Sequence, residues 1–257
     1  MAQAGLQIEL FIIIEVLFPY LFLIMASSSH ASHGSLGLRV HAEAGECAVG
    51  VRRRRRRRKL FPPPETVALD KINNIPMSFI IWSNGRREDS DGTKTLPVEQ
   101  PAKILTNSNL FIGDIDDALD VENLKRLNIG AVVTVCSEQI STKYYWSLPS
   151  LLAEAGIDQL VLRADDSWYF DIIPVAERAL VFIRSVLKDE STGVLVHCYG
   201  GVNRSGAVCA VYMAIELRIP LCEAVKHLRE ARGTVLTNQT FVKQLVRYCF
   251  LYGAELM

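Results

Sequence analysis

The sequence predicts an α/β fold in which helices cover both faces of a mostly parallel central sheet. Across residues 99–257, short apolar β-branched runs alternate with amphipathic stretches, which is typical of parallel strands joined by helical crossovers. Residues 131–136 form an almost uniformly apolar run, which indicates a strand buried on both faces. Near residue 200, a glycine-containing loop separates another such run from a helical stretch. Ligands of these sheets bind at the carboxyl ends of the strands, so this loop is the expected site.

Each predicted element has a local signal. Asp120 precedes an apolar periodic stretch as a helix N-cap, and Asn128 and Gly130 end that helix. Pro174 stands at the start of another amphipathic stretch, where a proline is tolerated because the first turn needs no backbone donor. The predicted strands are 110–112, 131–136, 159–162 and 194–196, and the predicted helices are 121–127, 146–155, 174–187, 205–217, 221–231 and 238–252.

Residues 1–98 are predicted to form a largely disordered N-terminal extension that precedes the domain at 99–257. The three prolines at 62–64 should stop any helix there. Farther along the extension we expect a strand at 77–82, a turn at 84–85 and a loop at 86–94.

An apolar segment at residues 6–25 has three possible interpretations. It is long enough for a marginal membrane anchor, although Glu15 near its centre would cost about 2.5–3.5 kcal/mol. It also has the length of a secretory signal, but no Lys or Arg precedes it. The third interpretation is an upstream extension that is rarely translated. The anchor and the upstream extension are favoured over the signal.

The charge and the cysteines suggest where the protein resides. The chain has 28 basic and 28 acidic residues, but Arg and Lys form an unbroken run at 52–59. Such a run is more often a solvated charge block, yet it could direct the chain to the nucleus or to anionic lipid. Six cysteines without a CxxC pair favour a reducing compartment. We therefore expect a cytoplasmic protein, membrane-anchored if residues 6–25 insert.

The most informative stretch follows the last predicted strand and reads His197-Cys198-Tyr199-Gly200-Gly201-Val202-Asn203-Arg204-Ser205. A strand, a glycine loop and a helix N-terminus together form an anion site from backbone N–H groups and the helix dipole. The same groups stabilise a thiolate at Cys198. The guanidinium of Arg204 can bind two oxygens of a phosphoryl group, and Ser205 can donate a hydrogen bond to the sulfur when it departs.

The pattern His-Cys-x-x-Gly-x-x-Arg-Ser resembles that of the cysteine-dependent protein phosphatases of the dual-specificity group. The similarity runs from about residue 105 to residue 251: residues 110–113 are similar to the family's first strand and glycine, and Asn238, Phe241, Gln244 and Leu245 to its closing helix. The resemblance implies the protein tyrosine phosphatase-like fold and a shallow cleft. Such a cleft admits phosphoserine and phosphothreonine as well as phosphotyrosine.

The resemblance also implies the roles of the site residues. Cys198 is the nucleophile that forms a phosphocysteine, and His197 and Ser205 complete the catalytic set with Arg204. Neither a cofactor nor a metal is required. The residues implied to bind phosphate are Tyr199, Gly200, Gly201, Val202, Asn203 and Arg204.

A carboxyl group is needed to protonate the departing oxygen and then to activate water. In the family this acid lies a little over thirty residues before the cysteine. Asp166 matches that spacing best, and Asp165 is the alternative.

Two other functions are compatible with the loop. Asn203 stands where many family members have serine, and Asn-Arg-Ser-Gly is similar to the Asn-Arg-Thr-Gly of RNA 5′-triphosphatases, which lack the general acid. Asp166 therefore favours a phosphorylated protein over a nucleic acid as substrate. At Tyr199 and Gly200, phosphoinositide phosphatases of this fold carry lysine, so a highly charged lipid is disfavoured. The other alternative is a catalytically inactive domain that only binds phosphoproteins, and an intact Cys198 argues against it.

Cys136 closes the predicted strand 131–136. Cys-Ser-Glu at 136–138 resembles the strand-end Cys-Ala-Glu of the tumour-suppressor phosphoinositide phosphatases, whose cysteine lies beside the catalytic one. Because the ends of neighbouring parallel strands meet, a reversible disulfide between Cys136 and Cys198 is one hypothesis. The simpler interpretation is that Cys136 is a small buried side chain.

Overall fold

The computed structural model describes residues 62–77, 79–81, 87–89, 101–136 and 142–257. Among these residues, no helix is both long enough and apolar enough to cross a bilayer. The apolar segment 6–25, the basic run 52–59 and the turn at 84–85 lie outside the described residues, so the hypotheses about them remain predictions.

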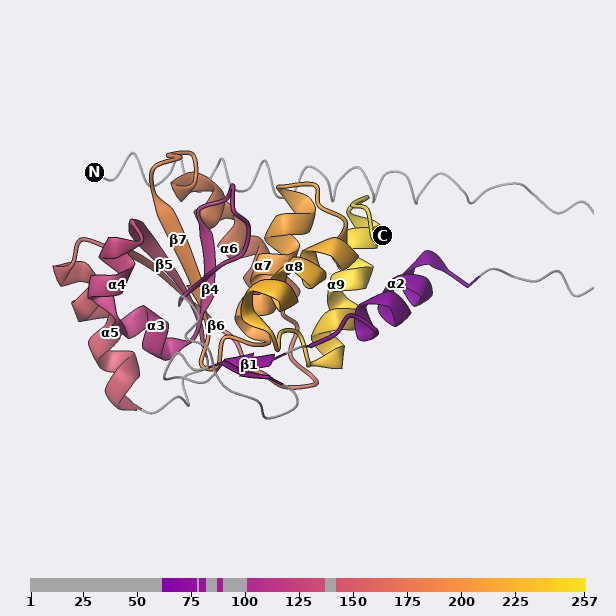
Figure 1. The fold of residues 1–257 in the computed structure, drawn as a ribbon, viewed down its shortest axis with the longest axis horizontal. Helices are drawn as coiled ribbons and strands as arrows, with labels where there is room; N and C mark the ends of the chain where they lie inside the picture. Colours follow the sequence, from indigo (N-terminus) through magenta and orange to yellow (C-terminus); the bar gives the residue numbers. More distant parts are fainter. Residues whose placement is uncertain (1–61, 78, 82–86, 90–100, 137–141) are drawn as a thin grey trace, which may run out of the picture. The chain divides into compact units, whose positions relative to one another are not determined.

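The described residues contain a five-stranded sheet in the order β3-β4-β7-β5-β6 (Figure 1). The strands β4, β7, β5 and β6 are parallel, whereas β3 at the edge is antiparallel to β4. The predicted mostly parallel sheet is therefore confirmed. The bounds are β3 (Ala102–Lys103), β4 (Leu110–Gly113), β5 (Ile129–Cys136), β6 (Asp158–Arg163) and β7 (Gly193–His197).

Side chains of the sheet alternate between two apolar cores, one on each face. On β7, Val194 and Val196 belong to one core and Leu195 to the other, and β5 alternates in the same way. Because both sides of these strands are buried, both sides must be apolar. This burial explains the continuous apolar runs in the sequence.

Helices cover both faces of the sheet, as predicted. In Figure 1, α3, α4 and α5 lie to the left of the strands and α7, α8 and α9 to the right. Helix α7 is buried along its entire length, because the sheet, α6, α8 and α9 all contact it. The bounds are α3 (Ile115–Leu119), α4 (Val121–Arg126), α5 (Thr142–Glu154), α6 (Ile173–Val186), α7 (Arg204–Ile215), α8 (Leu221–Arg232) and α9 (Gln239–Leu251).

Helix α2 (Pro64–Asn73) begins at the last of the three prolines, which were expected to stop any helix. Pro64 lies in the first turn, where its missing N–H costs no helical hydrogen bond. Ala68 and Ile72 are buried in the same core as α8 and α9. Thus α2 lies in the stretch that we predicted to be an extension, yet it packs on the domain.

Arg229 of α8 joins the end of α2 to the segment before α9. Its buried guanidinium donates to the carbonyl oxygens of Ile72 and Ile75 at 2.9 and 2.7 Å. It also donates to the carbonyl oxygens of Val235 and Leu236 at 3.1 and 3.4 Å. A buried charge with four acceptors is well satisfied, so this contact fixes both segments.

A small hairpin follows α2. Strands β1 (Phe79–Ile81) and β2 (Arg87–Asp89) pair antiparallel and are separate from the main sheet. The strand predicted at 77–82 is confirmed in its centre. The loop predicted at 86–94 was wrong for Arg87–Asp89, because strand pairing uses the backbone and charged residues are common in edge strands.

We expect Ile72→Ala to lower the free energy of unfolding by about 2–5 kcal/mol, because it removes a side chain buried between α2 and the domain. Asn73→Ala changes an exposed neighbour in the same helix and should have an effect of less than about 0.5 kcal/mol. Urea unfolding of the full chain, followed by tryptophan fluorescence, measures both variants. Equal stability of the two would show that α2 is not part of the folded core.

Candidate active site

The loop 198–203 lies at the carboxyl end of β7, a central strand of the sheet, and leads directly into α7. Cys198 is the first residue after the strand, and only 1% of its surface is exposed. Its Sγ lies 3.3 Å from Oγ of the buried Ser205. The order of strand, loop and helix N-terminus is the one that the sequence predicted.

Arg204 is the first residue of α7 and is buried. Its Nη1 donates to the carbonyl oxygen of Ala164 at 3.3 Å. Its Nε is buried and has no hydrogen-bond partner among the described residues. A guanidinium is always charged, and a buried donor without an acceptor is costly. The side chain is therefore suited to an anionic ligand beside Cys198.

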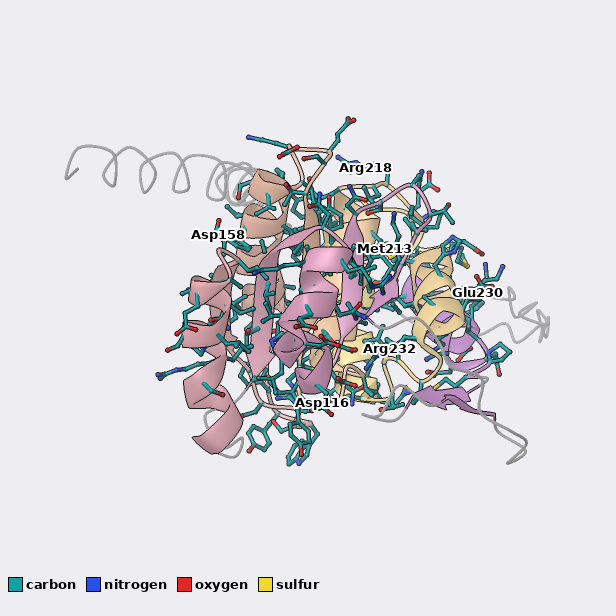
Figure 2. The ribbon with its side chains drawn as sticks, turned by 60° about the vertical axis from the view of Figure 1, so that its left-hand side comes forward. Asp116, Asp158, Met213, Arg218, Glu230 and Arg232 are labelled. Atoms are coloured by element: carbon teal, nitrogen blue, oxygen red, sulfur yellow. The ribbon has the colours of Figure 1, made fainter. Side chains whose placement is uncertain are left out.

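Gly201 can only be glycine at this position. Its φ is +64°, and a Cβ atom there would lie 2.5 Å from Nη2 of Arg232 and 2.7 Å from the carbonyl oxygen of Gly113. The loop therefore passes directly over the guanidinium of Arg232. Figure 2 shows Arg232 next to helix α3, which carries the labelled Asp116.

Arg232 is held by two buried carboxylates. It donates to Oδ2 of Asp114 at 2.8 Å and to Oδ2 of Asp117 at 3.1 Å. The same carboxylates form the capping box of α3. Burial raises the pKa of Asp117 to about 7, and the positive charge of Arg232 opposes this rise.

Two backbone hydrogen bonds fix the loop to its neighbours. The N–H of Ile115 donates to the carbonyl oxygen of Tyr199 at 3.3 Å, and the N–H of Leu236 donates to that of Val202 at 3.1 Å. The Tyr199 side chain is 55% exposed, and Gly200 is also exposed. The loop is therefore bound to neighbouring backbone through Tyr199 and Val202, while Gly200 and the Tyr199 side chain face solvent.

His197 is fully buried and connects β5 to the start of the loop. Its Nε2 lies 2.8 Å from Oγ1 of Thr134, which also accepts a hydrogen bond from Gln159. The Thr134 hydroxyl can therefore donate to Nε2, which leaves the ring proton on Nδ1, 3.3 Å from the carbonyl oxygen of Cys198. Burial lowers the pKa of His197 to about 4, so the ring is neutral near pH 7.

The structure brings Asp166 to the loop. Its Oδ2 accepts a hydrogen bond from Nδ2 of Asn203 at 3.0 Å, and its Oδ1 accepts one from Nδ2 of Asn238 at 3.0 Å. The neighbouring Asp165 is exposed, and its side chain forms no hydrogen bond with the described residues. Of the two aspartates, it is therefore Asp166 that contacts the loop, and its role as the acid stays a prediction.

Cys136 lies at the end of β5 and is buried. Burial raises the pKa of its thiol to about 12, and the nearby Cys198 contributes in the same direction. A disulfide between the two remains a prediction. Among the described residues, no cluster of three or more His, Cys, Asp or Glu side chains could hold a metal ion.

The residues that support the loop were not among those predicted from the sequence. Arg232 occupies the apolar face of α8, together with Leu221, Val225 and Leu228. An arginine at a buried position of an amphipathic helix is a usable signal, because such a charge needs buried partners. Asn238 was assigned only to the closing helix, although it also reaches Asp166.

We expect Gly201→Ala to abolish binding of inorganic phosphate, because the new Cβ must displace Arg232 or the loop. Gly200→Ala is the matched control, since a Cβ there would meet only Val202, at 3.9 Å. Isothermal titration calorimetry compares the two. Phosphate binding by Gly201→Ala at the parent's affinity would contradict the role assigned to this glycine.

The burial of His197 predicts a pH dependence of stability. The pKa of His197 is 6.5 when exposed and about 4 in the fold, so its contribution is present above pH 6.5 and is lost as the pH falls toward 4. The shift corresponds to about 3 kcal/mol. His197→Asn should be less stable at pH 7 and should lose less stability between pH 6.5 and 4. Urea unfolding between pH 6.5 and 4 measures how the free energy of unfolding of the parent and of the variant changes with pH. The same pH dependence in both proteins would exclude His197 as its cause.

Comparisons with known proteins show which family the chain resembles. A family model described as "Dual specificity phosphatase, catalytic domain" matches residues 110–249. The dual specificity protein phosphatases 26 of Bos taurus and Homo sapiens are each 31% identical over 137 residues, which cover 53% of this chain and 62% of the relatives' length. The chain thus spans less than two thirds of these relatives.

Solved structures show the same fold. Human DUSP28 is 23% identical, with a TM-score of 0.51, and the match covers 62% of this chain and 99% of that one. A mouse putative dual specificity phosphatase complexed with zinc tungstate is 25% identical, with a TM-score of 0.51. The match covers 63% of this chain and 95% of that one. Since the family model matches more than half of its residues, the chain belongs to the dual specificity phosphatase catalytic-domain family.

Proposed function

We propose that the chain is a cysteine-dependent protein phosphatase that hydrolyses phosphotyrosine, phosphoserine and phosphothreonine. One observation carries this proposal: one short loop at the end of β7 joins the buried Cys198 thiol at its start to the buried, incompletely paired guanidinium of Arg204, the first residue of α7. A nucleophile beside a cation and backbone N–H groups is what phosphoryl transfer requires. Phosphorylated proteins are the proposed substrates.

In the first step, the thiolate of Cys198 attacks phosphorus, an S–P bond forms and the ester P–O bond breaks. Arg204 and the backbone N–H groups of residues 198–203, here named the phosphate loop, bind the equatorial oxygens. Asp166 gives its proton to the departing oxygen, which leaves as an alcohol or a phenol. The product on the protein is a phosphocysteine.

In the second step, the Asp166 carboxylate takes a proton from water, and the water oxygen attacks phosphorus. The S–P bond breaks, and its electron pair returns to sulfur. Ser205, whose Oγ lies 3.3 Å from the sulfur, donates a hydrogen bond to the departing thiolate. Inorganic phosphate is released.

Cys198→Ser should abolish turnover of phosphotyrosine and phosphothreonine peptides, because a serine hydroxyl is not ionised at neutral pH. It should still bind these peptides, since Arg204 and the loop amides remain. Cys222→Ser, at another buried cysteine, should retain turnover. Phosphate release measures activity, and calorimetry measures binding.

Two results would contradict the proposal. Turnover by Cys198→Ser near the parent's rate would exclude this residue as nucleophile. Hydrolysis of an RNA 5′-triphosphate without hydrolysis of either peptide would favour the polynucleotide phosphatase, and binding without any turnover by the parent would favour the inactive binding domain.

A further inference from the structure

The carboxylate of Asp166 lies on residues 164–172, here named the acid loop. Asp166 is exposed, whereas Ala164 and Ile172 at the two ends of the loop are buried. Each of its two oxygens accepts one hydrogen bond from an asparagine amide, Asn203 on one side and Asn238 on the other, both at 3.0 Å. One donor belongs to the phosphate loop, and the other stands at the start of α9. The acid is therefore held between two elements that are themselves fixed.

The orientation of the Asn238 amide follows from the helix that it caps. Its Oδ1 accepts from the N–H groups of Thr240 and Phe241 at 3.0 and 3.4 Å. Because only the oxygen can accept, Nδ2 must point the other way, toward Asp166 and the carbonyl oxygen of Ser167. The helix cap thus turns the amide into a donor for the acid.

The Asn203 amide is oriented in the same manner. Its Oδ1 accepts from the N–H groups of Thr237 and Asn238 at 2.8 and 2.9 Å. Its Nδ2 is therefore also a donor, and it is this group that reaches Asp166. The two amides are linked to each other, since the backbone N–H of Asn238 is bound by Asn203.

We propose that Asn238 is a positioning residue for the general acid and acts together with Asn203. This inference rests on the proposed phosphatase function. Each carboxylate oxygen has two lone-pair sites, and one amide donor occupies one of them. A site therefore remains on each oxygen for the transferable proton, so Asp166 can act as acid and then as base while it is held.

The rest of the acid loop has its own support. Gln244, farther along α9, accepts from the N–H of Ile172 at 3.0 Å and donates to the carbonyl oxygen of Phe170 at 2.9 Å. Loss of the Asn238 amide should therefore release the amino-terminal part of the loop, which carries Asp166, without detaching the carboxyl-terminal end that Gln244 holds. The effect is expected on proton transfer rather than on the fold.

Asn238→Ser separates the two functions of this residue. A serine hydroxyl still caps α9, but it carries no amide to reach Asp166. We expect kcat/KM on a phosphotyrosine peptide, which reports the first step, to fall about 10–100-fold, the scale of a misplaced catalytic group. The fall on 4-nitrophenyl phosphate should be much smaller, because its leaving group needs no proton. Gln239→Ser, at the exposed neighbouring position, is the matched control and should resemble the parent.

A double-mutant cycle with Asp166→Ala identifies the residue through which Asn238 acts. Asp166→Ala should lower the rate on the phosphotyrosine peptide by about 10²–10⁴. In that background Asn238→Ser should cost nothing further. Asn238→Asp keeps the cap but places a second carboxylate against Asp166, so it should be more damaging than Asn238→Ser.

Equal losses on the two substrates, or independent losses in the cycle, would overturn the proposal, as would no loss in Asn238→Ser. Hydrogen–deuterium exchange of the full chain gives a readout that does not depend on activity. In Asn238→Ser, exchange at residues 165–169 should rise while exchange in α7 stays the same. Exchange at residues 165–169 equal to that of the parent would overturn the proposal. A parent chain without phosphatase activity would overturn the proposed function instead, and the exchange result would still decide whether Asn238 holds this loop.

Discussion

The buried ion pair between Arg232 and the two aspartates of α3 supports the whole site. Arg232 comes from the end of α8, and Asp114 and Asp117 cap a helix on the opposite face of the sheet. Removing these charges from water is costly, and the arrangement is stable only because every charge has a partner. The backbone of Gly201 packs directly against this guanidinium, so the position of the phosphate loop depends on this contact.

A second line of support begins at α2, which lies outside the residues matched by the family model. Arg229 binds the end of α2 and the carbonyl oxygen of Leu236. Leu236 has φ of +59°, which is unfavourable for a residue with a side chain, and its N–H binds Val202 in the phosphate loop. The side chain of Arg229 and the backbone of Leu236 therefore connect α2 to the active-site loop.

The sheet, its helices and the order of strand, loop and helix could be predicted, because buried segments have apolar patterns that can be recognised within a few neighbouring residues. Apolar runs mark strands buried on both faces, and the six-residue spacing of Cys198 and Arg204 marks the loop. The supporting contacts could not be predicted, because Arg232 and its aspartates lie more than 110 residues apart. Helix α2 was not predicted, because a proline that ends one helix also suits the first turn of the next, and the sequence does not say which of the two it does.

Helix α7 has no face in contact with solvent, since all of its residues are buried. The partial positive charge at its N-terminus is therefore reached from solvent only through the phosphate loop, because Arg204 and Ser205, the first residues of the helix, are buried. Counterions screen exposed charges over about 8–10 Å at moderate salt, but they act much less on a buried field. Ionic strength should thus act mainly on the exposed residues that meet the protein part of a substrate, and less on the attraction that holds the phosphoryl group.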